Sequence, residues 1–222
     1  FSYNIGNKVG FVPFGWGSKN GNLCDFPFIA ARPVPANLLT RPAKVFEQYV
    51  DIAATVAAIP QKVNQFPLPL QLVQPGYCLR ESHSWAVPLT SSAAQIGQIQ
   101  GMTAFGGTLV SAGVLLGVPY LMAGDAPRKV MVIISDGTDD PADIAITPRL
   151  INAGMCDKIR RVLTTQEAVG KISFIGINYA PTYNWKACVG EKNFYLPRTI
   201  KELERDLQRA VFEEVGHNVV KD

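Results

Sequence analysis

The stretch of residues 129–135 (KVMVIIS) constrains the fold of this chain more than any other. It is apolar at nearly every position, which is the composition of a parallel strand covered on both of its faces. Asp136 and Gly137 follow it and end the strand. The stretch therefore predicts a central strand of a parallel sheet, with the Asp136 carboxylate at its carboxyl end.

Strands and helices alternate through the second half of the chain. Residues 171–177 (KISFIGI) have the pattern of a second buried strand, and residues 194–196 that of a short third one. A helix is expected over residues 149–164, and Thr199 with Glu202 forms a capping box that opens the last helix. This alternation predicts an α/β fold with a doubly wound, mainly parallel sheet and helices on both faces.

The first half of the chain is less regular. Residues 8–14 are typical of a strand, and residues 42–59 have apolar side chains at helical spacing. Residues 60–90 are rich in proline and glutamine, so we expect an irregular loop insertion there. Ser91 or Ser92 is expected to cap a short helix.

Size, charge and hydropathy exclude several classes of protein. The chain has 222 residues, of which 47% are hydrophobic, and we expect residues 1–222 to form a single domain. The formal net charge of +3 is too small, and the basic residues too scattered, to indicate a nucleic-acid partner. The longest apolar run, residues 108–124, is shorter than the ~20 residues of a membrane-spanning helix. A buried core helix is the better interpretation of that run.

Two short motifs carry the chemistry. Ser135-Asp136-Gly137 places a carboxylate at a strand tip, where α/β sheets bind ligands. Gly106-Gly107-Thr108 places a hydroxyl at the start of a helix. Separately, the first motif is also typical of a turn and the second of a helix cap. Together they predict one hard-cation site, because hydroxyl and carboxylate oxygens are ligands that suit Mg²⁺.

The order of these motifs resembles the metal-ion-dependent adhesion site of von Willebrand factor A-type domains. Residues 8–14, 86–90, 172–177 and 187–195 resemble the branch of that family found in bacterial tight-adherence (Tad) pilus assembly. The resemblance implies that Thr108 and Asp136 hold Mg²⁺, with Mn²⁺ or Ca²⁺ as alternatives. It also implies that a partner's carboxylate completes the coordination shell and that no reaction is catalysed.

One departure from the family concerns its first strand. That strand ends in an Asp-x-Ser-x-Ser motif, which this sequence lacks, and the chain begins where the family's second strand is expected. We therefore expect the first strand to lie upstream or on another chain, and loss of the metal site is the other interpretation. Full-length relatives usually carry an N-terminal membrane helix, which implies an anchored protein although these residues hold no spanning segment.

Further oxygen donors lie close to the two motifs. Asp139 and Asp140, together with Asp143, follow the strand tip and form either an acidic rim beside the metal or a solvated loop. Thr103 is the alternative hydroxyl ligand, although its spacing to the following glycines resembles the family less.

The cysteine pattern bears on the compartment. Cys24, Cys78, Cys156 and Cys188 form no Cys-x-x-Cys pair, and two histidines are too few for the zinc patterns. Two structural disulfides, which indicate an extracytoplasmic protein, are one interpretation, and four buried thiols are the other. The layout of the elements favours Cys156 with Cys188 and Cys24 with Cys78, among three possible connectivities.

These features predict a binding module and not an enzyme. We expect an adhesion or pilus-assembly protein of the bacterial cell envelope, located in the periplasm or at the cell surface. Its expected partners are other pilus or envelope proteins, or a surface ligand, and not nucleic acid. One alternative is a structural scaffold domain with a degenerate metal site. Another is a metal-dependent hydrolase that uses Asp136 and the acidic residues after it, which requires a second converging carboxylate or histidine.

Overall fold

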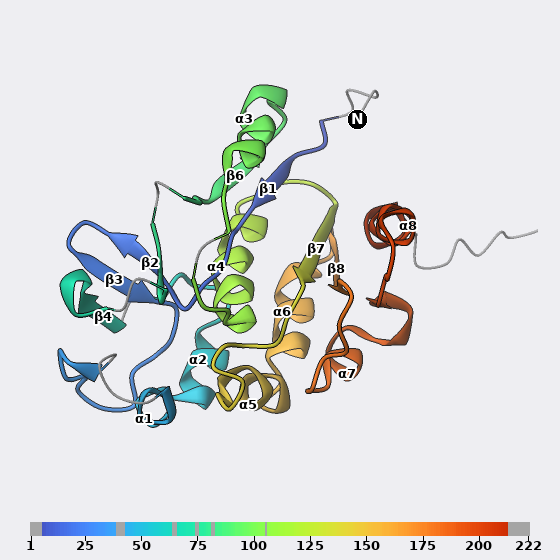
Figure 1. Cartoon of the computed structure of the whole chain (residues 1–222). Helices are drawn as coiled ribbons and strands as arrows, with labels where there is room; N and C mark the ends of the chain where they lie inside the picture. The colour runs from blue at the N-terminus through green and yellow to red at the C-terminus, as the bar shows by residue number, and fades with distance from the viewer. Residues whose placement is uncertain are drawn as a thin grey trace, which may run out of the picture.

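The computed structural model describes residues 6–38, 43–63, 66–73, 76–80, 83–104 and 106–212 (Figure 1). The strands are β1 (Val9–Phe11), β2 (Gly17–Asn20), β3 (Leu23–Phe26), β4 (Phe66–Pro69), β5 (Cys78–Leu79), β6 (Val87–Thr90), β7 (Arg128–Ser135), β8 (Val169–Gly176) and β9 (Phe194–Tyr195). The α-helices are α1 (Ala43–Glu47), α2 (Ile52–Ala58), α3 (Ala93–Gly97), α4 (Val110–Met122), α5 (Ile146–Asn152), α6 (Met155–Leu163), α7 (Trp185–Val189) and α8 (Ile200–Phe212).

These strands form three separate sheets, so the prediction of one doubly wound, mainly parallel sheet is wrong. β1 and β6 make an antiparallel pair, and β4-β3-β2-β5 is a mixed sheet. Only β7-β8-β9 is parallel throughout. The predicted alternation of strands and helices holds in the second half, but the strands of the first half form an antiparallel pair and a mixed sheet instead.

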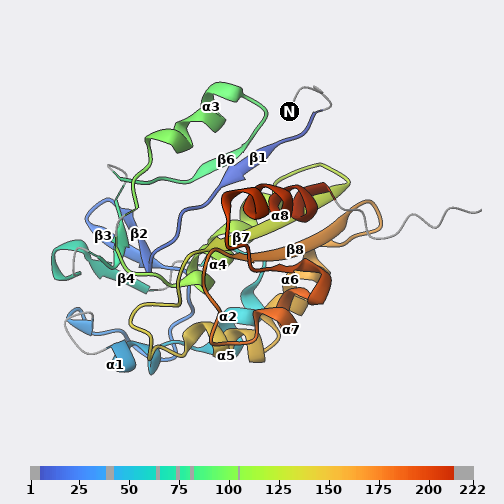
Figure 2. The ribbon, with the colours of Figure 1, turned by 45° about the vertical axis from the view of Figure 1, so that its right-hand side comes forward.

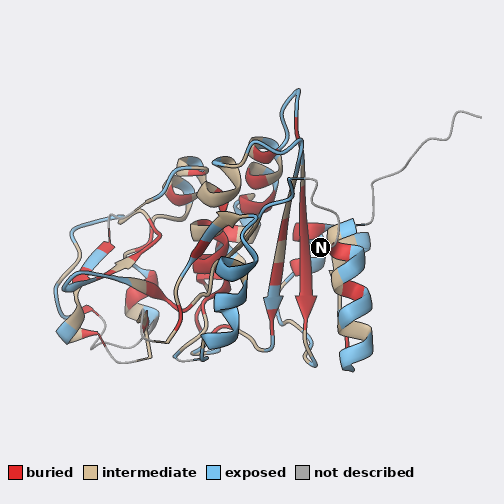
Figure 3. Ribbon diagram, turned by 90° about the horizontal axis from the view of Figure 1, so that it is seen from above, coloured by how far each residue is buried: buried red, intermediate tan, exposed pale blue. Residues whose placement is uncertain are grey.

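The parallel sheet is the part of the molecule that most resembles the prediction. α4 and α6 pack on one face of it and α8 packs on the other (Figure 2, Figure 3). β8 is buried from Lys171 to Gly176. β7 pairs with β8 along all of its eight residues and, among the described residues, with no other strand. The apolar run at residues 129–135 is thus a strand as predicted, but it lies at an edge and not at the centre.

Residues 60–90 are not the irregular insertion that their composition predicts. They contribute β4, β5 and β6 to two of the sheets. In β4 the side chains of Phe66 and Leu68 are buried and alternate with Pro67 and Pro69. Proline is tolerated because β4 is an edge strand, where an absent N–H breaks no ladder. The proline content therefore conceals a strand.

Two predicted helices are each divided. The helix predicted over residues 42–59 is interrupted between α1 and α2. Asp51 caps α2 by accepting a hydrogen bond from the Ala54 amide (2.8 Å). Residue 42 lies outside the described residues. In residues 149–164 the break falls at Gly154, whose φ of 86° is a left-handed conformation that favours glycine. The predicted caps at Ser92 and Thr199 are confirmed.

Both predicted disulfides are present. Cys24–Cys78 joins β3 to β5, and Cys156–Cys188 joins α6 to α7. Two disulfides place this domain outside the reducing cytoplasm. In the described part of the chain, no helix is both long and apolar enough to cross a membrane.

Candidate functional site

A cleft of about 360 Å³ lies at the carboxyl end of β7. Its walls come from the residues after β1, the loop before α4, the end of β7 and the residue after β8. Thr108 and Asp136, the two residues predicted as metal ligands, both line it, as does the alternative ligand Thr103. The full lining is Pro13, Phe14, Leu79, Ser84, Met102, Thr103, Ala104, Gly106, Gly107, Thr108, Ile134, Ser135, Asp136 and Ile177.

The Gly-Gly-Thr loop is shaped by close contact with a neighbouring loop. Gly106 has a φ of 103°, and a Cβ added there would lie 2.4 Å from the carbonyl oxygen of Gly76. The amide of Gly107 donates a hydrogen bond to that same oxygen. Position 106 therefore requires glycine for both its backbone conformation and its lack of a side chain. The contact fixes where Thr108 enters the cleft.

Thr108 is held by its main chain. Its carbonyl oxygen accepts a hydrogen bond from the Asp140 amide (2.8 Å), and the Asp140 carbonyl in turn accepts one from Trp16 Nε1 (2.7 Å). Trp16 is fully buried. Leu109 occupies the N-cap position of α4, so Thr108 is not the cap of this helix.

Asp139 performs the capping instead. Its Oδ1 accepts a hydrogen bond from the Val110 amide (2.8 Å), the first residue of α4, and the side chain is 2% exposed. Burial raises the pKa of this carboxyl, and the Thr147 hydroxyl, the Val110 amide and the Tyr183 hydroxyl oppose that rise. A carboxylate at a helix N-terminus is favourable because it satisfies an unpaired amide.

The predicted acidic rim is therefore not formed by these residues. Asp139 points into the interior, and neither it nor Asp140 lines the cleft. The side chain of Asp140 is exposed, and its main-chain amide donates a hydrogen bond to the Thr108 carbonyl oxygen. The sequence shows that four carboxylates follow the strand, but not which of them the loop turns inward.

The Ser-Asp-Gly motif forms a turn that leaves its carboxylate at the surface. The Ser135 hydroxyl donates a hydrogen bond to the Gly137 carbonyl (2.8 Å), while Asp136 is exposed at the strand tip. Tyr179 lies nearby. Burial raises the pKa of Tyr179, a hydrogen bond with Ser135 opposes this, and the charges of Asp139 and Asp136 add to the rise.

Sequence reasoning missed Tyr179 and Tyr183, which belong to the segment after β8. Burial raises the pKa of Tyr183, and the neighbouring Asp139 carboxyl adds to the rise. A signal for both was present, because the carboxyl ends of adjacent parallel strands meet at one edge of a sheet. The residues after β8 were therefore bound to lie beside those after β7.

The donor set of the cleft is of the right kind for a hard cation but small. The cleft offers the Asp136 carboxylate and the hydroxyls of Thr108, Thr103 and Ser84. Among the described residues, no three His, Cys, Asp or Glu side chains gather where they could hold a metal ion. Mg²⁺ is normally bound by one or two carboxylates together with water or ligand oxygens. These residues alone do not make a complete metal centre.

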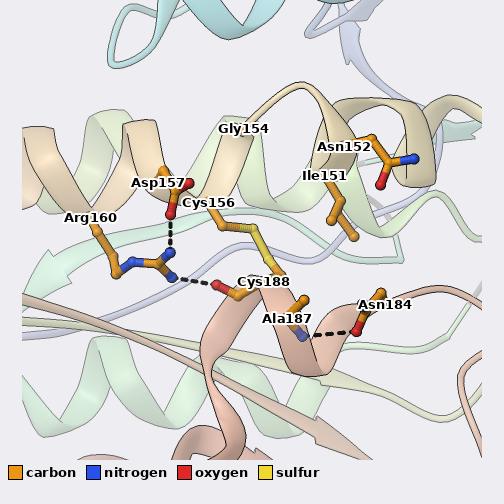
Figure 4. Close-up of a pocket in the computed structure, with 9 residues that line it drawn as sticks. All are labelled: Ile151, Asn152, Gly154, Cys156, Asp157, Arg160, Asn184, Ala187 and Cys188. Carbon is orange, nitrogen blue, oxygen red and sulfur yellow. Dashed lines mark hydrogen bonds and ion pairs between the residues drawn. A yellow bond between two sulfur atoms is a disulfide. The ribbon is translucent and has the colours of Figure 1, made fainter.

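A second cavity, of about 210 Å³, is lined in part by the Cys156–Cys188 disulfide (Figure 4). Its charged groups are already engaged, since Arg160 pairs with Asp157 and also donates to the Cys188 carbonyl oxygen. Asn184 accepts a hydrogen bond from the Ala187 amide (2.9 Å) and so caps α7. Because these polar groups bind one another, the cavity has the character of a structural junction.

Comparison of the chain with models of protein families, with curated proteins and with solved structures finds no match. The features that bear on function are therefore the cleft, the two disulfides and the Gly-Gly-Thr and Ser-Asp-Gly motifs.

Proposed function

We propose that this protein is an extracytoplasmic binding module of the bacterial cell envelope, of the von Willebrand A-type adhesion class found in Tad pilus assembly. The observation that carries the proposal is that Thr108 and Asp136, which lie on either side of α4 in the sequence, line one cleft. The sheets of this chain differ from the sheet first expected for that class, so the proposal concerns the site and its chemistry.

The cleft binds its partner through a shared divalent cation. Thr108 and Asp136 supply two oxygen ligands, water supplies others, and an oxygen of the partner completes the shell. One carboxylate holds Mg²⁺ weakly, so neither the ion nor the partner binds tightly alone. Each strengthens the binding of the other by the same factor, because the coupling between two ligands is reciprocal. Mn²⁺ and Ca²⁺ are alternative ions for the same oxygen donors.

The apolar wall of the cleft supports a polypeptide partner. Phe14, Leu79, Met102 and Ile134 line the cleft together with its polar groups. Apolar side chains are typical of the fully buried core of a protein–protein interface. The two disulfides favour a partner outside the cytoplasm, and we propose another pilus or envelope protein, or a surface ligand.

Capture of envelope proteins on the immobilised chain tests the proposal. We expect capture in Mg²⁺ that EDTA abolishes, and that Thr108→Ala lowers by about tenfold or more, equal to ~1.4 kcal/mol. Thr103→Ala is the matched control, because it removes a hydroxyl from the same cleft. Equal capture in Mg²⁺ and in EDTA would instead support the scaffold interpretation. Loss with Thr103→Ala alone would assign the ligand to Thr103.

A further inference from the structure

The loop that carries Thr108 lies against residues of the four-stranded sheet. Gly107 precedes Thr108, and its amide donates a hydrogen bond to the Gly76 carbonyl oxygen. Gly76 lies just before β5, an edge strand of that sheet. β2, β3 and β4 lie on one side of α4, and the parallel sheet that leads to Asp136 lies on the other (Figure 1, Figure 2). The two proposed cation ligands are therefore placed by different sheets.

Four residues of the four-stranded sheet and its flanks contact this loop. A Cβ added at Gly107 would lie 3.5 Å from both Trp16 Nε1 and the Gly76 carbonyl oxygen. A Cβ added at Gly15 would lie 3.4 Å from the Gly107 carbonyl oxygen and 3.5 Å from Leu79 Cδ2. Gly15 and Trp16 come directly before β2, and Leu79 ends β5. We call Gly15, Trp16, Gly76 and Leu79 the loop seat.

β5 holds one side of the loop seat and is itself a very short strand. It has two residues, and within the described residues it pairs with β2 alone, beginning with Gly17 opposite Cys78. The Gly17 amide also donates a hydrogen bond to the Tyr77 carbonyl oxygen (3.0 Å). A ladder of this length provides few hydrogen bonds, and the net contribution of each one to stability is small. Backbone pairing alone therefore holds β5 weakly.

The Cys24–Cys78 disulfide adds a covalent link at this strand. It joins β5 to β3 across β2, the strand that lies between them. A Cβ added at Gly17 would lie 2.9 Å from Cys24 Sγ, so the bond passes β2 at a residue without a side chain. Both cysteines are buried. The disulfide thus fixes the strand from which Gly76 and Leu79 reach the loop.

We propose that the Cys24–Cys78 disulfide is a positioning element of the cation site. It holds β5 in place, β5 holds the Gly76 carbonyl oxygen, and that oxygen holds the Gly107 amide beside Thr108. Loss of groups that orient metal ligands lowers metal affinity by about 10- to 100-fold. The inference rests on the proposed function and adds that the disulfide determines how well the site binds its ion.

The Cys156–Cys188 disulfide provides the matched control. It joins α6 to α7, and the described residues that line the cleft belong to neither of these helices. Loop-closure entropy predicts similar contributions to stability from the two disulfides, because it depends only weakly on the length of the closed loop. A difference between their variants at the cleft therefore reports on position and not on overall stability.

Tyr77 allows the loop seat to be weakened while both disulfides remain. It lies between Gly76 and Cys78, and its ring packs edge-on against Trp16 with the centroids 4.8 Å apart. Tyr77→Ala removes this contact, whereas Tyr77→Phe keeps the ring. Tyr77 is only half-buried, so its replacement is milder than loss of a buried disulfide. This variant decides the matter if Cys24→Ala/Cys78→Ala does not fold.

Hydrogen exchange at the Gly107 amide, measured in EDTA, tests the positioning without any cation. We expect exchange at least about tenfold faster in Cys24→Ala/Cys78→Ala than in Cys156→Ala/Cys188→Ala, because the Gly76 carbonyl oxygen is no longer held. Tyr77→Ala should also exchange faster than wild type, and Tyr77→Phe should return to the wild-type rate. Equal rates in the two cysteine variants would overturn the proposal, as would an unchanged rate in Tyr77→Ala.

Mn²⁺ titration of the same variants, followed by line broadening at residues 106–108, connects the positioning to the ion. We expect the affinity of Cys24→Ala/Cys78→Ala to be about tenfold below that of Cys156→Ala/Cys188→Ala. Equal affinities would overturn the proposal even if the exchange rates differ. Absence of Mn²⁺ binding by wild type would overturn the proposed function, whereas the exchange comparison would still decide whether the disulfide positions the loop.

Discussion

At the scale of single residues, Gly106 is the position on which the geometry of the cleft depends most. Its left-handed backbone and its contact with the Gly76 carbonyl leave no space for a side chain. We predict that Gly106→Ala lowers the free energy of unfolding by about 3 kcal/mol. Gly97→Ala is the control, because no atom lies within 4 Å of a Cβ added there. It should be neutral or stabilising by up to ~1 kcal/mol, since Gly97 ends a helix. Guanidinium denaturation of both variants gives the comparison, and equal losses would contradict it.

Asp139 is the residue whose role differs most from its prediction. Asp139 was predicted to lie at the rim of a metal site. In the structure it caps α4 instead, because its carboxylate accepts a hydrogen bond from the Val110 amide. We predict that Asp139→Ala costs about 1–3 kcal/mol, because the Val110 amide is left without a partner in a buried place. Asp139→Asn keeps an acceptor oxygen and should cost less.

The pKa of Asp139 also predicts a pH dependence. Burial raises its pKa in the folded state, so the folded chain binds more protons than the unfolded chain above the ordinary pKa of about 3.9. Stability contributed by this group is then present below that pH and falls as the pH rises through the folded-state pKa. We predict that the free energy of unfolding of wild type, relative to Asp139→Asn, falls as the pH rises from about 3 to 7. A pH-independent difference in urea titrations would contradict this.

At the scale of elements, each disulfide closes a long loop of the chain. The Cys24–Cys78 bond closes a separation of 54 residues and the Cys156–Cys188 bond one of 32. Loop-closure entropy predicts that each stabilises the fold by about 4 kcal/mol, and that the two differ by only about 0.5 kcal/mol. We therefore expect similar losses for the Cys24→Ala/Cys78→Ala and Cys156→Ala/Cys188→Ala pairs in guanidinium denaturation. A pair whose removal costs nothing would show that its bond is not formed.

Elements were predictable from the sequence where the pattern is local. β7, β8, α4 and α8 follow from apolar runs, helical spacing and the Thr199 cap. Pairing between strands was not predictable, because Val9 pairs with Thr90 and Leu23 with Pro69 across long separations that no local pattern encodes. The prolines of β4 led to the prediction of a loop. Proline is compatible with an edge strand, but the sequence alone does not show that β4 lies at an edge.

At the scale of the whole molecule, one buried core joins the four-stranded sheet to the parallel sheet, and the cleft lies at the carboxyl end of β7. Its two predicted ligands come together because a strand tip and a helix start lie at the same end of the parallel sheet. That much of the site followed from the sequence. The inward orientation of Asp139 and the positions of Tyr179 and Tyr183 could not be predicted from the sequence, because they depend on the conformation of loops.

We propose that Thr108 and Asp136 bind one divalent cation. Mn²⁺ titration, followed by amide line broadening in NMR spectra of the isotope-labelled chain, tests it most directly. We predict weak binding, in the roughly millimolar range, because the cleft supplies a single carboxylate. Broadening should centre on residues 106–108 and 135–137 and should be lost in the Thr108→Ala and Asp136→Asn variants. Broadening centred on other carboxylates, such as Asp157, or unchanged by both substitutions, would contradict the claim.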